Sequence, residues 1–111
     1  MTILEELYNI LTGLGLDVET GVFNDRAPDE YIVITPMLDT FPLFGDNMPI
    51  LESSEVRISL YSQKNYINRK KLIVETLLNM GFTITGQTHL GREEDTGYFH
   101  ASIDVSKSYI F

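Results

Sequence analysis

The sequence contains no cysteine, few basic residues and no long apolar run, and each absence excludes a class of protein. Without cysteine, the 111-residue chain can form no disulfide bond, thiolate nucleophile or cysteine-based zinc site, which excludes a disulfide-rich secreted scaffold. Eight basic residues face sixteen acidic ones, and the net charge of -8 argues against stable binding of nucleic acid through its phosphates. No apolar run approaches about 18 residues and no basic segment opens the chain, so neither a membrane span nor a signal peptide is predicted. We expect a soluble protein of a reducing cytoplasm.

Hydrophobic periodicity predicts seven regular elements in a single domain spanning residues 1–111. They are a helix over 3–13, strands over 18–23 and 31–37, a strand over 55–62, a helix over about 65–80, and strands over 82–90 and from 99 to about 106. Thr2 and Glu5 form a capping box before the first helix, and Gly13 and Gly15 end it. The order favours an α+β two-layer sandwich, in which two helices pack on one face of a mainly antiparallel sheet of about five strands.

The second helix and the outer strands predict which side chains face the core. The apolar sector of the helix contains Tyr66, Ile67, Ile73, Val74, Leu77, Leu78 and Met80. Leu72 falls on its polar side, where the fold gives no reason for a leucine. Alternation in the strands predicts a hydroxyl-rich open sheet face made of Arg57, Ser59, Tyr61, Thr83, Thr85, Gln87, His89, His100, Ser102 and Asp104.

The candidates for catalysis or metal binding are few. His89 and His100 are predicted to share the open face, near the turn that holds Glu93, Glu94 and Asp95, and two imidazoles with a carboxylate suit Zn²⁺ or Fe²⁺. Their spacing matches no ligand motif and the turn is solvated, so we predict ordinary surface residues and no metal site.

Other catalytic arrangements are also missing from the sequence. There is no nucleophile elbow and no phosphate-binding glycine loop. The acid pairs Asp29–Glu30 and Glu93–Glu94 lie in polar turns, where burial would not separate their pKa values. We therefore predict a protein with no catalytic residue and no cofactor, which is not an enzyme.

One basic cluster stands out against the acidic background. Lys64, Arg69, Lys70 and Lys71 lie at the start of the second helix and could contact phosphate. Lys70 points into the apolar sector and must extend its amine to water, and the others have acids nearby to pair with. A solvated helix face is the favoured interpretation.

The segment 38–54 breaks the pattern of regular elements. Pro42, Gly45 and Pro49 predict an irregular loop, yet apolar residues crowd into it: Leu38, Phe41, Leu43, Phe44, Met48, Ile50 and Leu51. A loop of this length is unusual in a small domain, and its apolar content argues against disorder. Either it folds back as a lid over the core, or it is an arm that docks on another protein. The predicted interface consists of Leu38, Phe41, Leu43, Phe44, Met48 and Ile50, extended by Tyr61 and Leu72.

Three stretches give the sequence a resemblance to a known family. They are DTFPLFGDN (39–47), EVRISLYS (55–62) followed by Asn65 and Tyr66, and EDTGYFHASIDV (94–105). They are similar to small proteins from the head-tail gene clusters of phages and prophages of Gram-positive bacteria, in the tail terminator or tail-completion group. The order of helices and strands is similar too, so the resemblance covers nearly the whole chain.

The resemblance implies a virion protein that is made in the host cytoplasm and joins heads to tails. Such a protein forms a ring of about six copies on the head-proximal end of the tail tube, stops tube polymerisation and contacts the head connector. DNA passes through without specific binding, and Asp39, Asp46, Glu93, Glu94 and Asp95 are candidates to line the channel. Alternatives are a connector component on the head side, a small cytoplasmic regulator that holds a host protein, and a metal-dependent enzyme using His89 and His100.

Overall fold

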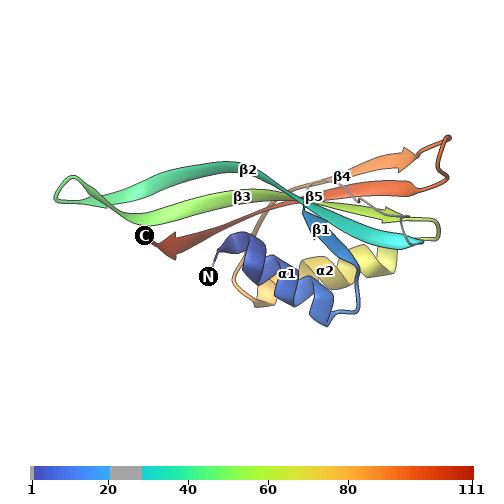
Figure 1. Ribbon diagram of the computed structural model, residues 1–111, viewed down its shortest axis with the longest axis horizontal. Helices are drawn as coiled ribbons and strands as arrows, with labels where there is room; N and C mark the ends of the chain where they lie inside the picture. Colours follow the sequence, from blue (N-terminus) through green and yellow to red (C-terminus); the bar gives the residue numbers. More distant parts are fainter. Residues whose placement is uncertain (1, 21–28) are drawn as a thin grey trace.

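The computed structural model describes residues 2–20 and 29–111 and has the predicted α+β architecture. The elements are α1 (Ile3–Gly13), β1 (Val18–Thr20), β2 (Glu30–Gly45), β3 (Met48–Ser62), α2 (Ile67–Asn79), β4 (Thr83–Arg92) and β5 (Phe99–Ile110). The strands form one sheet in the order β1-β2-β3-β5-β4. Only β1 and β2 are parallel in the described sheet; the other pairs are antiparallel. Both helices lie on the same face of the sheet (Figure 1). The part of the first predicted strand beyond residue 20, and the predicted turn around Pro28, lie outside the described residues.

Helix α1 has the predicted bounds and the predicted start. The Thr2 hydroxyl oxygen accepts a hydrogen bond from the Glu5 N–H at 3.2 Å, and the hydroxyl in turn donates to the Glu5 carboxylate. Gly15 follows the helix with a φ of 84°, a conformation that costs a residue with a side chain far more than glycine. Ile3, Leu7 and Leu11 form the buried stripe.

The core lies between the helices and the middle of the sheet. Its largest fully buried apolar side chains are Leu7, Leu11, Ile32, Ile34, Val56, Ile58, Leu60, Ile73, Leu77, Ile103 and Val105. Helix α2 buries a narrower stripe than its sequence predicts: Ile73 and Leu77 are buried, whereas Ile67, Leu78 and Met80 are at least half exposed. The prediction that these three face the core is wrong, because only the centre of the apolar sector contacts the sheet.

The segment 38–54 is a β-hairpin and not the irregular loop that the sequence predicts. Asp46 and Asn47 form its two-residue turn with φ values of 52° and 64°, the left-handed conformations that a type I′ hairpin turn requires. Register shifts after Pro36 and Thr40 absorb extra residues, and Pro42 falls within the second of them. Pro49 pairs with Phe44 at the end of the ladder. The prolines are accommodated because the hairpin is irregular where they occur.

We call residues 38–54 the arm, because this hairpin projects from the body (Figure 1). The molecule measures 53 × 27 × 24 Å and has a radius of gyration of 15.1 Å, where a compact chain of this length would have about 13 Å. The arm does not fold back over the core, so its interpretation as a lid is wrong.

Candidate interaction surface

The arm exposes all six apolar side chains that the sequence assigns to an interface. Leu38, Phe41, Leu43, Phe44, Met48 and Ile50 are between 40% and 65% exposed. Scattered apolar residues are normal on a protein surface, but six of them on one hairpin, with the Phe41 and Phe44 rings 6.2 Å apart, make the hairpin a candidate contact site. Because the hairpin holds its own backbone hydrogen bonds, these side chains are presented on a pre-formed element.

The end of β5 adds two residues that the sequence analysis missed. Phe111 donates its backbone N–H to the Ile50 carbonyl at 2.8 Å, and its ring lies edge-on to that of Phe41 at 4.9 Å. Ile110 is 87% exposed beside Leu51. The available signal for a longer strand was the sequence after Val105, where Lys107 and Tyr109 continue the positions of one face and serines occupy the positions between them.

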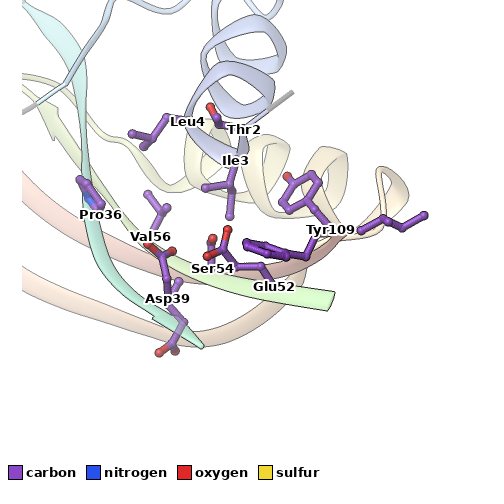
Figure 2. A pocket seen from close by; sticks show the side chains of 12 residues that line it. Thr2, Ile3, Leu4, Pro36, Asp39, Glu52, Ser54, Val56 and Tyr109 are labelled. Carbon is purple, nitrogen blue, oxygen red and sulfur yellow. The ribbon is translucent and has the colours of Figure 1, made fainter. Parts of the chain in front are cut away.

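A groove of about 400 Å³ lies where the arm joins the body (Figure 2). Its lining combines apolar and acidic side chains: Thr2, Ile3, Leu4, Pro36, Asp39, Glu52, Ser54, Glu55, Val56, Tyr109, Ile110 and Phe111. Near it, the Lys107 ammonium contacts both Glu6 carboxylate oxygens at 2.8 and 2.9 Å and ties β5 to α1. Burial and the Glu6 carboxylate raise the pKa of Tyr109 to about 12. The Tyr109 hydroxyl donates to Glu6 at 3.4 Å, so this part of the groove lining is connected to α1.

Tyr61 and Leu72 do not extend the surface of the arm. Tyr61 pairs with Tyr31 near the far end of the β2–β3 ladder, and Leu72 lies in the first half of α2, which begins at the same end (Figure 1). Leu72 is 40% exposed on the polar side of the helix, as predicted. Within one chain these two residues and the arm therefore belong to separate surfaces.

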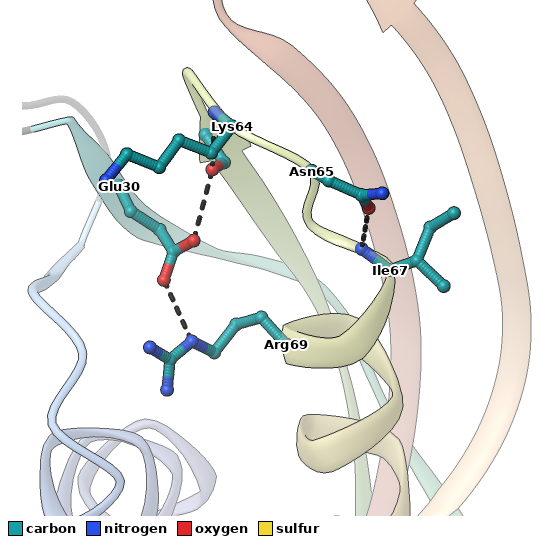
Figure 3. A network of polar contacts seen from close by, with 6 residues as sticks. Glu30, Lys64, Asn65, Ile67 and Arg69 are labelled. Carbon is teal, nitrogen blue, oxygen red and sulfur yellow. Dashed lines mark hydrogen bonds and ion pairs between the residues drawn. The ribbon is translucent and has the colours of Figure 1, made fainter.

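Two residues of the basic cluster, Lys64 and Arg69, line a hollow with Leu72, and Glu30 binds Arg69 (Figure 3). The Glu30 carboxylate accepts hydrogen bonds from Arg69 Nε at 2.9 Å and from the Ser62 hydroxyl at 3.1 Å. Lys70 donates to the side-chain oxygen of Gln87. The first turn of α2 contains no acidic residue, although acids are the residues that a helix start favours.

The channel candidates fall into two groups at opposite ends of the molecule. Asp39 and Asp46 lie on the arm, whereas Glu93, Glu94 and Asp95 lie at the turn between β4 and β5 (Figure 1). All five side chains are exposed. The two groups therefore belong to separate parts of the surface.

The two histidines lie on opposite faces of the sheet, contrary to the sequence prediction. Gln87 pairs with Ile103, and His89 pairs with Ala101. Ile103 and Ala101 are buried on the helix side, so Gln87 and His89 also lie on that side of the sheet. A register shift between Ile84 and Gly86 reverses the alternation in β4 and explains this placement. The Tyr66 hydroxyl, from the start of α2, lies 2.6 Å from His89 Nδ1. No cluster of three metal-ligating side chains occurs in the described parts of the chain.

His100 belongs to a row of aromatic rings on the open face. Its ring stacks on Tyr61 with centroids 4.2 Å apart, and Tyr61 stacks on Tyr31 at 4.8 Å. Burial lowers the pKa of His100; Glu93 opposes this effect and Arg57 adds to it. His100 Nε2 is buried and has no hydrogen-bond partner among residues 2–20 and 29–111.

We expect this histidine to make stability depend on pH. A lowered folded-state pKa means that, below about pH 6.5, the unfolded chain binds the proton more readily than the folded one. The contribution of neutral His100 to the free energy of unfolding is therefore fully present above that pH, and it is lost as the pH decreases toward the folded-state pKa of His100. Urea unfolding between pH 7 and 5.5 should show this loss. His100→Phe keeps the stack and should flatten the slope, whereas His89→Gln should preserve it; equal slopes for His100→Phe and the parent protein would contradict the assignment.

Comparison with known proteins adds no identification to this geometry. No protein-family model and no curated protein matches the chain. No helix in the described part of the chain is long and apolar enough to cross a membrane. The functional conclusion therefore depends on the arm, the charge distribution and the motifs of the sequence.

Proposed function

We propose that the chain is a non-enzymatic assembly protein of a phage-like particle, which forms a ring at the head-proximal end of the tail tube, ends tube polymerisation and joins the tail to the head connector. The observation that carries the proposal is the arm, a pre-formed hairpin whose exposed apolar side chains project from the body. Contact of these apolar side chains with water is unfavourable, and exposed apolar elements of this kind are typical of surfaces that another protein covers.

An exposed arm could contact many kinds of protein, and the sequence resemblance favours assembly of a phage-like particle. The stretch DTFPLFGDN forms most of the outer strand and the turn of the arm, and EVRISLYS forms the end of β3 that anchors it in the sheet. The acidic balance of the chain suits a ring through which DNA must slide without binding. A connector ring on the head side uses the same features, and a regulatory binder would use the arm alone.

Native mass spectrometry of the purified protein at micromolar concentrations tests the ring directly. We expect a closed assembly of about six copies, because contacts between two different surfaces of identical subunits give cyclic symmetry when the ring closes. Purified tails from a mutant that makes no heads should contain the protein, which separates the tail position from the head position. A strict monomer that is absent from tails and from particles would overturn the proposal and favour the regulatory binder.

A further inference from the structure

Opposite charges occupy two distant parts of this molecule. The arm carries three acidic residues, Asp39, Asp46 and Glu52, and no basic one. Residues 64–72, at the start of α2, carry the four cations of the basic cluster and no acid. The arm extends from one end of the body while α2 starts at the other (Figure 1). One chain therefore cannot bring the two surfaces together, but two copies can.

The basic end also offers a place for apolar side chains. A shallow hollow of about 300 Å³ is lined by Glu30, Lys64, Asn65, Asn68, Arg69 and Leu72. Its one acid, Glu30, already binds Arg69 and Ser62. The Lys64 ammonium has no ion-pair or hydrogen-bond partner in the described ranges, and the only partner of Lys71 there is Glu75 at 3.9 Å. We call this surface the Leu72 hollow.

The tip of the arm has the matching chemistry. Asp46 occupies the turn, and Phe44 and Met48 flank it with 56% and 65% of their surface exposed. Docking through side chains suits this hairpin better than strand addition, because Pro36 and Pro42 lack N–H donors and the register shifts make β2 irregular. A carboxylate between two large apolar groups complements a leucine that shares a hollow with Lys64 and directly follows the exposed Lys71 in α2.

We propose that the arm tip of one copy docks in the Leu72 hollow of the next copy, with Asp46 facing Lys64 and Lys71, and Phe44 and Met48 against Leu72. Such a contact joins different surfaces of identical chains, so repetition gives a ring where the rotation closes and an open filament where it does not. This contact identifies the partner of the arm as a second copy of the chain. It therefore rests on the proposed function, which assembles identical copies.

Disulfide trapping tests the contact in a chain that has no cysteine of its own. Met48→Cys in one preparation is mixed with Asn68→Cys in another, and with Asn79→Cys as the matched control. Asn79 is exposed like Asn68 and lies about 16 Å further along the same side of α2. We expect the Asn68→Cys mixture to form the mixed dimer about tenfold faster or more, because docking raises the local thiol concentration. Equal rates for the two mixtures would overturn the proposal.

Charge reversal provides an independent measurement that a folding defect cannot imitate. Lys64→Glu with Lys71→Glu in the Asn68→Cys chain should reduce trapping by the parent arm to the control rate. Asp46→Lys in the Met48→Cys chain should restore it, because the charges on both sides of the contact are then exchanged. Failure of this rescue, with both chains folded, would contradict the contact.

The two proposals fail in different ways. A ring in native mass spectrometry with no preference for Asn68→Cys would overturn the docking contact and leave the ring in place. Preferential trapping in a protein that forms only open chains, and that is absent from particles, would support the docking contact and overturn the ring.

Discussion

Replacing Phe44 and Met48 with serine should leave the protein folded and reduce the yield of joined particles about a hundredfold or more. Both side chains lie at the arm tip and are more than half exposed, so their loss costs the folded monomer little. At an interface, large apolar anchors of this kind contribute about 2 kcal/mol or more each, and a ring repeats the loss at every subunit. Phe41 is a less suitable target, because its ring packs against Phe111.

The matched control replaces two large apolar residues elsewhere that are also about half exposed. Leu78→Ser with Met80→Ser alters two residues at the end of α2 that are 53% and 50% exposed, away from the arm and from the Leu72 hollow. Electron microscopy should show separate heads and tails for the arm variant and normal particles for the control. Normal particles from the arm variant would remove the arm from assembly.

The order and type of the elements could be predicted from the sequence because periodicity and capping act locally. Helix α1 has its predicted bounds, since the Thr2 cap and Gly15 fix both ends without help from the rest of the chain. The strands around Ile58 and Ile103 alternate apolar and polar residues over their central parts, which determines the buried face of each.

Apart from the over-wide apolar sector of α2, the errors occur where pairing between strands overrides the local pattern. Pro42 and Pro49 predict a loop, but register shifts in the β2–β3 ladder accommodate them, and the Asp46–Asn47 turn closes the hairpin. That dipeptide, between two apolar runs, was the available hairpin signal. The shift before Gly86 moves Gln87 and His89 to the helix side, and no local pattern in β4 reveals it.

The interface residues were found in part, for a reason that the fold makes clear. Six of them lie on the arm because they are close in sequence and belong to one hairpin. Phe111 joins this surface through pairing between β3 and β5, which links residues far apart in the sequence. Leu72 stood out because it breaks the amphipathic pattern of α2, and the structure places it at the opposite end from the arm, in a hollow with Lys64 and Arg69.

Two leucine substitutions on the same antiparallel pair should separate the stability of the body from the function of the arm. Leu60 on β3 is fully buried, whereas Leu43 on β2 is 48% exposed. Leu60→Ala removes apolar contacts and leaves a cavity, so we expect it to lower the free energy of unfolding by about 2–5 kcal/mol. The melting temperature should fall by about 10 °C or more.

Leu43→Ala should change the free energy of unfolding by less than about 1 kcal/mol and weaken self-association instead. Urea unfolding measures the first quantity, and the ring population at a fixed protein concentration measures the second. If Leu43→Ala destabilised the monomer as much as Leu60→Ala, the arm would be part of the folding core and its exposed side chains would need no partner. The opposite result separates the two roles: the sheet beneath the helices stabilises the chain, and the hairpin that extends from it is retained for a contact.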